Sequence, residues 1–425
     1  MAKGDGSIIN RGRNLWEVQV SFGKDPITKR YRKVSRTVRG TKAEARKVRD
    51  QIRREHDSGM SADAATVTFA EVADMWQKSR EASGELSFRT LKDGEYIIAC
   101  YSRFIGGMRL ADIDPYTVES LYAAIRKEKA DAGRPVGGTT MHKFHVVLKQ
   151  IFQKAVDNDL MMRNPCDRVK APKKDEPERR SLTVDEGARL LRLVDEAEEE
   201  AYREMAEKEA RQTERGNLFG RTAIRGLYPL GNVLAVRIGI ATGMRLGEVM
   251  GLVWGNVDLN QPCIRVAQQL TTYGEVKPPK GRCKSRTVAL DATAAAHLER
   301  WKRRQAVELL KIGIKQDDTT PVCCSDTGGF YSVQNFQRWW RPWRTARGFE
   351  SLKFHELRHT QATQLLANGV DVKTVQSRLG HSDASITLNW YAHAVPENDE
   401  KAANLIGELF AAEHDEPRII EVRTA

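Results

Sequence analysis

The sequence lacks several features that would place the protein in familiar classes. It has no run approaching the roughly 18 apolar residues of a membrane-spanning helix, and its opening residues, MAKGDGSIIN, contain no apolar stretch of the signal-peptide type. The six cysteines form no CxxC pair and no metal-ligand spacing, which indicates free thiols in a reducing cytoplasm (Cys100, Cys166, Cys263, Cys283, Cys323 and Cys324). A GxxxxGKS or GxxxxGKT nucleotide loop and an Asp/Glu metal cluster are also missing. We therefore expect a cytoplasmic protein that uses no metal or cofactor and has no membrane partner.

Positive charge is abundant and unevenly distributed. The 425 residues carry a net charge of +12. Residues 1–57 hold 16 Lys and Arg against 7 Asp and Glu, a net charge of +9, whereas residues 396–425 hold 3 against 8, a net charge of −5. A surface adjusted only for solubility would spread its charge, so the basic front indicates a polyanionic partner, most often nucleic acid.

The first 57 residues predict a small sheet followed by a helix. Trp16, Val18, Val20 and Phe22 alternate with polar residues, as in a half-buried strand. Thr41, with a Glu three residues later, forms a capping-box sequence before a helix that runs to about Gly59. We interpret residues 1–57 as a basic DNA-binding domain.

Residues 66–165 predict an all-helical domain. The stretch FAEVADMW places Phe69, Val72, Ala73 and Trp76 on one helical face, and further helices are expected at about 87–104, 115–131 and 138–158. In the last of these, one apolar stripe is expected to contain Val146, Val147, Ile151, Phe152 and Ala155. The proline-containing segment that follows is typical of a linker.

Residues 179–395 predict a larger, mainly helical domain with a small antiparallel sheet, followed by an acidic tail over 396–425. Either Ser181 or Thr183 is expected to cap its first helix, and the charged stretch 195–215 is typical of a solvated helix. Residues 263–290 predict strands with turns at 273–274 and at 280–281. The whole chain is therefore expected to be mixed α+β.

Four short stretches of this third domain carry polar residues of chemical interest. ATGMRLGE places Arg245 after a helix-ending Thr-Gly, with Glu248 one turn later. VKPPKGRCKS places Lys280 at an apparent hairpin tip. HELRH places His355 and Arg358 on one helical face, and RLGHSDASITLNWY places His381 in a turn and Tyr391 on the next helix. Each stretch alone is typical of an ordinary solvated surface.

Together, in this order and with the final spacing of ten residues from His to Tyr, these stretches closely resemble the tyrosine recombinases, the phage-integrase family. The resemblance implies that the catalytic residues are Arg245, Lys280, His355, Arg358, His381 and the nucleophile Tyr391, with Glu248 in support. It also implies that residues 66–165 form a core-type DNA-binding domain and that residues 1–57 form the arm-type domain of the larger integrases. Gly281 follows the lysine where Thr is common in the family, so Lys277 or Lys284 stays an alternative to Lys280. The charged region at about 195–230 looks like an insertion.

The implied reaction is attack of the Tyr391 phenol on a DNA phosphodiester, which gives a 3′-phosphotyrosine and a free 5′-hydroxyl. The implied function is site-specific recombination that integrates, and in reverse excises, a phage or another mobile element in a bacterial cell. The expected partners are double-stranded DNA attachment sites and three further copies of the chain in a tetramer, with a DNA-bending host factor and an excisionase as candidates. Two alternatives stay open at this point, a non-catalytic DNA-binding regulator and a type IB topoisomerase-like enzyme.

Overall fold

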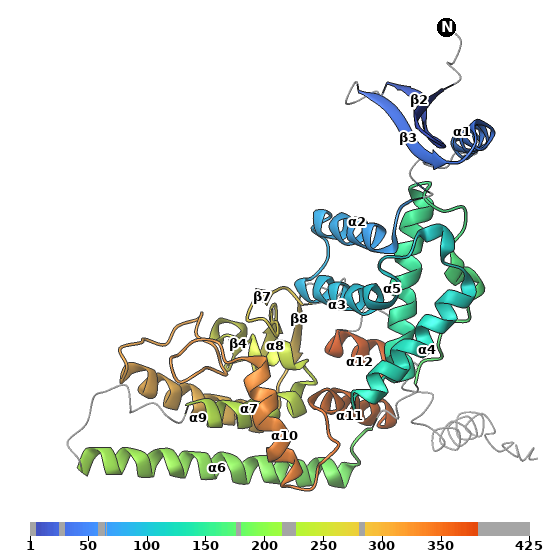
Figure 1. Ribbon diagram of the computed structural model, residues 1–425. Helices are drawn as coiled ribbons and strands as arrows, with labels where there is room; N and C mark the ends of the chain where they lie inside the picture. Colours follow the sequence, from blue (N-terminus) through green and yellow to red (C-terminus); the bar gives the residue numbers. More distant parts are fainter. Residues whose placement is uncertain are drawn as a thin grey trace, which may run out of the picture. The chain divides into compact units, whose positions relative to one another are not determined.

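A computed structural model describes residues 6–24, 30–57, 64, 66–175, 180–214, 227–279 and 285–380. The chain divides into two compact units, residues 1–177 and residues 178–425 (Figure 1). No helix in these ranges is both long enough and apolar enough to cross a membrane. The mixed α+β class expected from the sequence is confirmed, whereas the domain boundaries stay predictions.

The first unit begins with a three-stranded antiparallel sheet in the order β1-β2-β3, covered by one helix: β1 (Ser7–Gly12), β2 (Leu15–Lys24), β3 (Tyr31–Arg39) and α1 (Lys42–Asp57). The alternation in β2 is confirmed, because Val18 and Val20 are buried against Ala45 and Ile52 of α1. The capping box is also present: the Glu44 carboxylate accepts from the Thr41 backbone N–H at 2.7 Å.

The rest of the first unit is helical. Its elements are α2 (Phe69–Ala82), α3 (Phe88–Ile105), η1 (Leu110–Asp112), α4 (Pro115–Asp131), α5 (Gly138–Asp157) and η2 (Pro165–Arg168). Four residues of the predicted α2 face are buried in one apolar core (Phe69, Val72, Ala73 and Trp76). The stripe expected on α5 is wrong at one position: Val146 is 39% exposed, whereas its neighbours Val147 and Ile151 are buried. Two adjacent valines lie about 100° apart on a helix, so a single core cannot bury both equally.

The second unit is built around α7 (Leu227–Thr242), which is buried along almost its whole length. The other helices are α6 (Val184–Glu214), α8 (Leu246–Met250), η3 (Trp254–Asn256), α9 (Ala292–Leu310), α10 (Val333–Thr345), α11 (Phe354–Ala367) and α12 (Val372–Leu379). Thr183, not Ser181, caps α6, since its hydroxyl accepts from the Glu186 backbone N–H at 3.2 Å.

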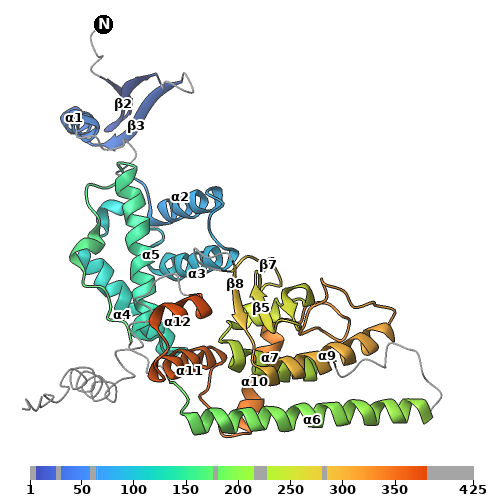
Figure 2. The ribbon, with the colours of Figure 1, turned by 180° about the vertical axis from the view of Figure 1, so that it is seen from behind.

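The long helix α6 corrects one expectation. The stretch 195–215 was expected to be a solvated helix, but α6 runs alongside α7 and α9 (Figures 1 and 2). Glu198 is fully buried and accepts from Arg237 Nε of α7 at 3.0 Å and contacts His297 Nδ1 of α9 at 2.8 Å. Charged residues farther along α6 pair with Arg300, Arg304 and Lys311 of α9 and its end. Much of the charge in this helix is therefore used in tertiary contacts.

The described strands of the second unit form two small sheets. One has the order β4-β5-β8 (Val257–Asp258, Cys263–Val266 and Arg286–Ala289), and the other pairs β6 (Gln269–Leu270) with β7 (Val276–Lys277). The turn predicted near Gly274 closes the β6-β7 hairpin, and Gly274 adopts a positive φ of 81°. Among the described strands, β7 pairs with β6 and β8 pairs with β5, whereas the turn expected at Lys280 and Gly281 lies outside the described residues.

Candidate active site

Arg245 and Glu248 occupy the first turn of α8. Arg245 Nη1 donates to Glu248 Oε1 at 2.9 Å, and the backbone N–H of Arg245 donates to the other carboxylate oxygen, also at 2.9 Å. The Glu248 side chain is only 1% exposed, whereas that of Arg245 is 30% exposed. The Glu248 carboxylate thus holds both the backbone and the guanidinium of Arg245, and the Arg245 side chain is still partly exposed to solvent.

Arg286 of β8 also binds the Glu248 carboxylate. Its Nη1 and Nη2 donate to the two oxygens of Glu248 at 3.1 and 2.7 Å, and its Nε donates to the backbone carbonyl of Arg378 at 2.9 Å. Burial alone would raise the pKa of Glu248, but the hydrogen bonds and charge of Arg286, together with Arg245, outweigh it and lower that pKa. Glu248 is therefore an ionised carboxylate shared by two guanidiniums.

Arg358 lies in the first half of α11 and is almost completely buried, with 1% of the residue exposed. Its Nη1 donates to the carbonyl of Gly243 at 3.1 Å, and its Nη2 has no hydrogen-bond partner within the described part of the chain. Burial first, and then repulsion by Arg245, lowers the pKa of Arg358 to about 9. A buried guanidinium with an unpaired N–H group next to a second guanidinium favours an anion at this place.

Gly243 makes this arrangement possible. It has a φ of 64°, in the region that favours glycine, and a Cβ added there would lie 2.6 Å from Leu379 and 2.7 Å from Gln361 Oε1. Any other residue would force the ends of the Leu379 and Gln361 side chains to move and would be strained at this φ.

His355 and His359 lie one turn apart on α11. Their rings are perpendicular at a centroid separation of 4.8 Å. His355 is exposed, whereas His359 is only 9% exposed. Of the two, His355 is the ring that can reach a molecule bound from solvent.

The structure thus brings three of the sequence-predicted residues into one electrostatic cluster, namely Arg245, Glu248 and Arg358, with His355 on the same helix as Arg358. The other three, Lys280, His381 and Tyr391, lie outside the described residues. The alternative lysine at 277 is described: it ends β7 and pairs with Glu275 at 2.8 Å. Within the ranges that the structure covers, no three His, Cys, Asp or Glu side chains are grouped so that they could hold a metal ion.

Arg286 was missed in the sequence. It stands in a basic run, KGRCKSR, that contains three other Lys and Arg residues. The available signal was its position directly before the apolar alternation of a strand, but its partner Glu248 lies 38 residues away, beyond the reach of local pattern.

Known proteins match the sequence of this chain over most of its length. Residues 226–398 match the family model described as the phage integrase family. A tyrosine recombinase XerC-like protein of Caldanaerobacter subterraneus is 25% identical over 424 residues, which covers 95% of this chain and 98% of the relative. The ICEBs1 integrase of Bacillus subtilis is 24% identical over 414 residues. The match covers 95% of this chain and 100% of the relative.

Solved structures with the same fold include integrases bound to DNA. The integrase of the Tn1549 transposon, in complex with a circular intermediate DNA, superposes with a TM-score of 0.60 at 17% identity, over 79% of this chain and 99% of that one. A lambda integrase dimer bound to a COC′ core site gives a TM-score of 0.51 at 19% identity, over 90% of this chain and 93% of that one. Residues 226–398 thus carry a domain of the phage integrase family, and the solved integrases share the fold of this chain.

Proposed function

We propose that this site-specific DNA recombinase cuts and rejoins DNA through Tyr391, and that Arg245 and Arg358 bind the phosphate under attack. The observation that carries the proposal is the buried Arg358, whose Nη2 has no partner among the described residues and whose pKa is lowered by burial and by Arg245. An anionic phosphodiester placed there would accept that N–H and offset the repulsion between the two guanidiniums.

In this mechanism the Tyr391 oxygen attacks phosphorus, and the bond to the 5′-oxygen of the next nucleotide breaks. The products are a 3′-phosphotyrosine and a free 5′-hydroxyl. A phenol has a pKa near 10 and needs a base, a role we assign to His355. Lys280 protonates the departing 5′-oxygen, and His381 donates to a non-bridging oxygen.

The two guanidiniums offset the negative charge that gathers on the non-bridging oxygens in the transition state. Arginine suits this role because its planar fork contacts two oxygens and stays protonated. A hydroxyl of a partner strand then attacks the phosphotyrosine and restores the phosphodiester. The phosphoester bond is conserved throughout, so the reaction needs no nucleoside triphosphate.

The nucleophile assignment is tested with Tyr391→Phe. The variant should bind a cognate DNA site with unchanged affinity, because it loses one hydroxyl and little apolar area. It should form no covalent protein–DNA complex on denaturing gels, whereas the wild type should form one in EDTA without nucleotide. A wild-type amount of adduct from the variant would refute the assignment, and a strict requirement for magnesium would refute the role given to the two arginines.

The proposed biological setting is supported by the relatives rather than by the site. The ICEBs1 integrase and the Tn1549 transposon integrase both carry the names of mobile elements. We extend this to the present chain: its substrates are the double-stranded attachment sites of a phage or another mobile element, and recombination integrates or excises that element in a bacterial cell. A DNA-bending host factor and an excisionase are the candidate accessory partners.

We also propose that the chain acts as a tetramer on DNA. A lambda integrase tetramer on a Holliday junction shares the fold at a TM-score of 0.50. In the tail of the present chain, Leu405, Ile406, Leu409 and Phe410 repeat with helical spacing, and the segment lies outside the described residues. Docking of this segment on a neighbouring copy would link the subunits.

Deletion of residues 402–425 tests this link. The shortened protein should bind a single core site nearly as well as the wild type in a gel-shift assay. It should lose most of the slower-moving complex that joins two sites, because each junction between copies loses an apolar contact. An equal loss of both complexes would assign the tail a folding role within its own copy.

A further inference from the structure

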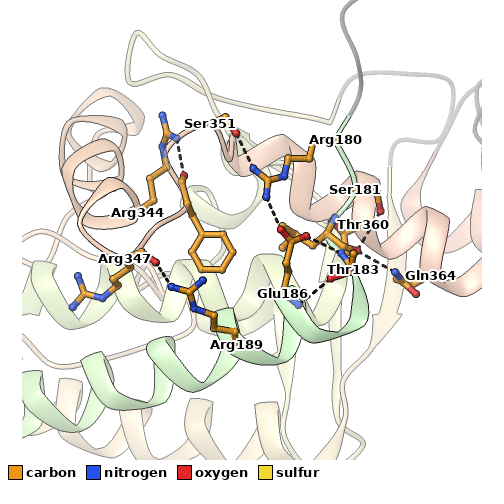
Figure 3. Close-up of polar contacts among 12 residues, drawn as sticks. Arg180, Ser181, Thr183, Glu186, Arg189, Arg344, Arg347, Ser351, Thr360 and Gln364 are labelled. Atoms are coloured by element: carbon orange, nitrogen blue, oxygen red, sulfur yellow. Dashed lines mark hydrogen bonds and ion pairs between the residues drawn. The ribbon is translucent and has the colours of Figure 1, made fainter.

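The point where the chain enters the catalytic unit is fastened to the helix that carries Arg358 and His355. Residue 180 is the first described residue after the helical unit, and α6 begins at Val184. Between them, Leu182 is 2% exposed and belongs to the core of the catalytic unit. Figure 3 shows the polar contacts that surround this entry segment.

Two residues of α11 hold the backbone of Leu182. Its N–H donates to Thr360 Oγ1 at 2.9 Å, and its carbonyl accepts from Gln364 Nε2 at 3.0 Å (Figure 3). Thr360 in turn donates to the carbonyl of Glu356 at 2.8 Å. Thr360 and Gln364 are four residues apart, so they lie on the same face of the helix. Together they bind both the N–H and the carbonyl of Leu182.

A second pair of contacts fastens the same segment to the loop before α11. Arg180 Nη1 donates to Ser351 Oγ at 2.9 Å, and its Nη2 pairs with Glu186 at 2.6 Å. From the first turns of α6, Arg189 donates to the carbonyl of Arg347 at 3.1 Å and lies over the ring of Phe349, 5.3 Å from its centroid. We call the contacts of Arg180, Leu182 and Arg189 with this loop and α11 the entry clasp.

The glycine beside these contacts fits the clasp. Gly348 has a φ of 78°, and a Cβ added there would lie 3.1 Å from Arg189 Nη2. A side chain at this position would be strained and would crowd the arginine. The absence of a side chain at Gly348 thus leaves room for the Arg189 guanidinium against the loop.

On its other side, α11 contacts the end of α7. Gln361, the neighbour of Thr360, donates to the carbonyls of Ile240 and Ala241 at 3.0 and 2.8 Å. Arg358 donates to the carbonyl of Gly243, two residues farther along. Helix α11 is therefore held between the entry segment and the turn that carries Arg245. A movement of α11 at the entry segment would also change its hydrogen bonds with the end of α7.

We infer that the entry clasp is a positioning device for the recombination reaction: Thr360 and Gln364 tie the position of α11, and with it Arg358 and His355, to the segment through which the DNA-binding unit is joined. This inference rests on the proposed function. The clasp residues touch no reacting atom and act through the helix. Because displacements of about 1 Å at a reacting centre can cost up to about 100-fold in rate, a loosened clasp should slow chemistry rather than weaken DNA binding.

The test uses the full chain with Thr360→Val, Gln364→Met and the conservative Thr360→Ser. The measured quantities are the dissociation constant for a core site and the single-turnover rate of covalent adduct formation at saturating DNA. We expect Thr360→Val and Gln364→Met to cleave about tenfold more slowly, with dissociation constants within about twofold of the wild type. Thr360→Ser, which keeps the hydroxyl, should restore the rate.

Two control variants separate positioning from general destabilisation. Thr293→Val makes the same chemical change at an exposed position of α9 and should leave the rate unchanged. Val194→Ala, in the buried core on α6, should lower the melting temperature without slowing cleavage at saturating DNA. Clasp variants that cleave at the wild-type rate would overturn the inference. So would a Val194→Ala variant that slows cleavage as much as the clasp variants do, because lost stability alone would then explain their rates. A wild-type protein that forms no adduct at all would instead defeat the proposed function.

Discussion

At the scale of single residues, Glu248 is the structural centre of the candidate active site. It is buried, and it accepts hydrogen bonds from Arg286 on β8 and from Arg245 on α8. Removing one partner of a buried ion pair typically costs about 3–5 kcal/mol, since it leaves a charge without compensation. Arg286 also holds the carbonyl of Arg378 near the end of α12, so one side chain links three separate segments.

This cluster makes stability depend on pH in a defined direction. The pKa of Glu248 is lowered from its ordinary value of 4.5. Its ionisation therefore stabilises the fold fully above pH 4.5, and this contribution is lost as the pH falls through the folded-state pKa. We expect the free energy of unfolding of the wild type to exceed that of Glu248→Gln at pH 7, and the difference to shrink towards pH 3. Urea unfolding at several pH values measures it, and a difference independent of pH would contradict this role.

Local spacing was enough to predict one half of this cluster. Arg245 and Glu248 are three residues apart at a helix start, so their contact follows from the sequence. The contact of Glu248 with Arg286 depends on where β8 lies in its sheet, and that register is set by β5. The burial of Arg358 likewise depends on the packing of α7 against α11, which no local pattern contains.

At the scale of elements, α6 shows how composition can mislead. Its charged second half has the spacing of a surface helix, and some pairs, such as Lys208 with Glu204, are indeed local and exposed. Others reach α9, about 100 residues away, as in the pair of Glu209 with Lys311. The signal that favours packing was the apolar series that includes Ala197 and Met205, both of which are buried. The helix starts and ends were better determined, because capping residues such as Thr183 act locally.

The interior of α6 should therefore tolerate charge loss much less than its surface. Glu198→Gln leaves His297 facing a neutral side chain and leaves Arg237 with the half-exposed Asp195 as its remaining carboxylate partner. We expect it to lower the free energy of unfolding by about 3 kcal/mol. The matched substitution Glu204→Gln removes an exposed pair within one helix and should cost less than about 0.5 kcal/mol. Chemical denaturation of both variants gives the comparison. If both variants lose the same small amount of unfolding free energy, α6 is a solvated helix after all.

At the scale of the whole molecule, positive charge is concentrated away from the proposed catalytic residues. Residues 1–57 carry a net charge of +9, and their sheet has an apolar core of its own. One face of the sheet packs on α1 through Val18 and Val20. The opposite face carries polar side chains, among which Glu17 accepts from Arg11, Gln19 and Ser35. A polar sheet face on a basic module has the chemistry to contact both phosphates and base edges.

The last prediction is that this front segment recognises its own class of DNA site. A protein lacking residues 1–57 should still bind and cleave a core site, but should fail at integration that requires flanking arm sites. The isolated segment should protect discrete sequences from nuclease away from the crossover. Salt sensitivity alone decides nothing, since every neutralised phosphate contributes a log–log slope of about −0.9 whether or not sequence is read. Competition with scrambled DNA of equal length decides it, because only contacts to base edges distinguish sequences. If scrambled DNA competes equally well, residues 1–57 are a non-specific tether to the phosphate backbone.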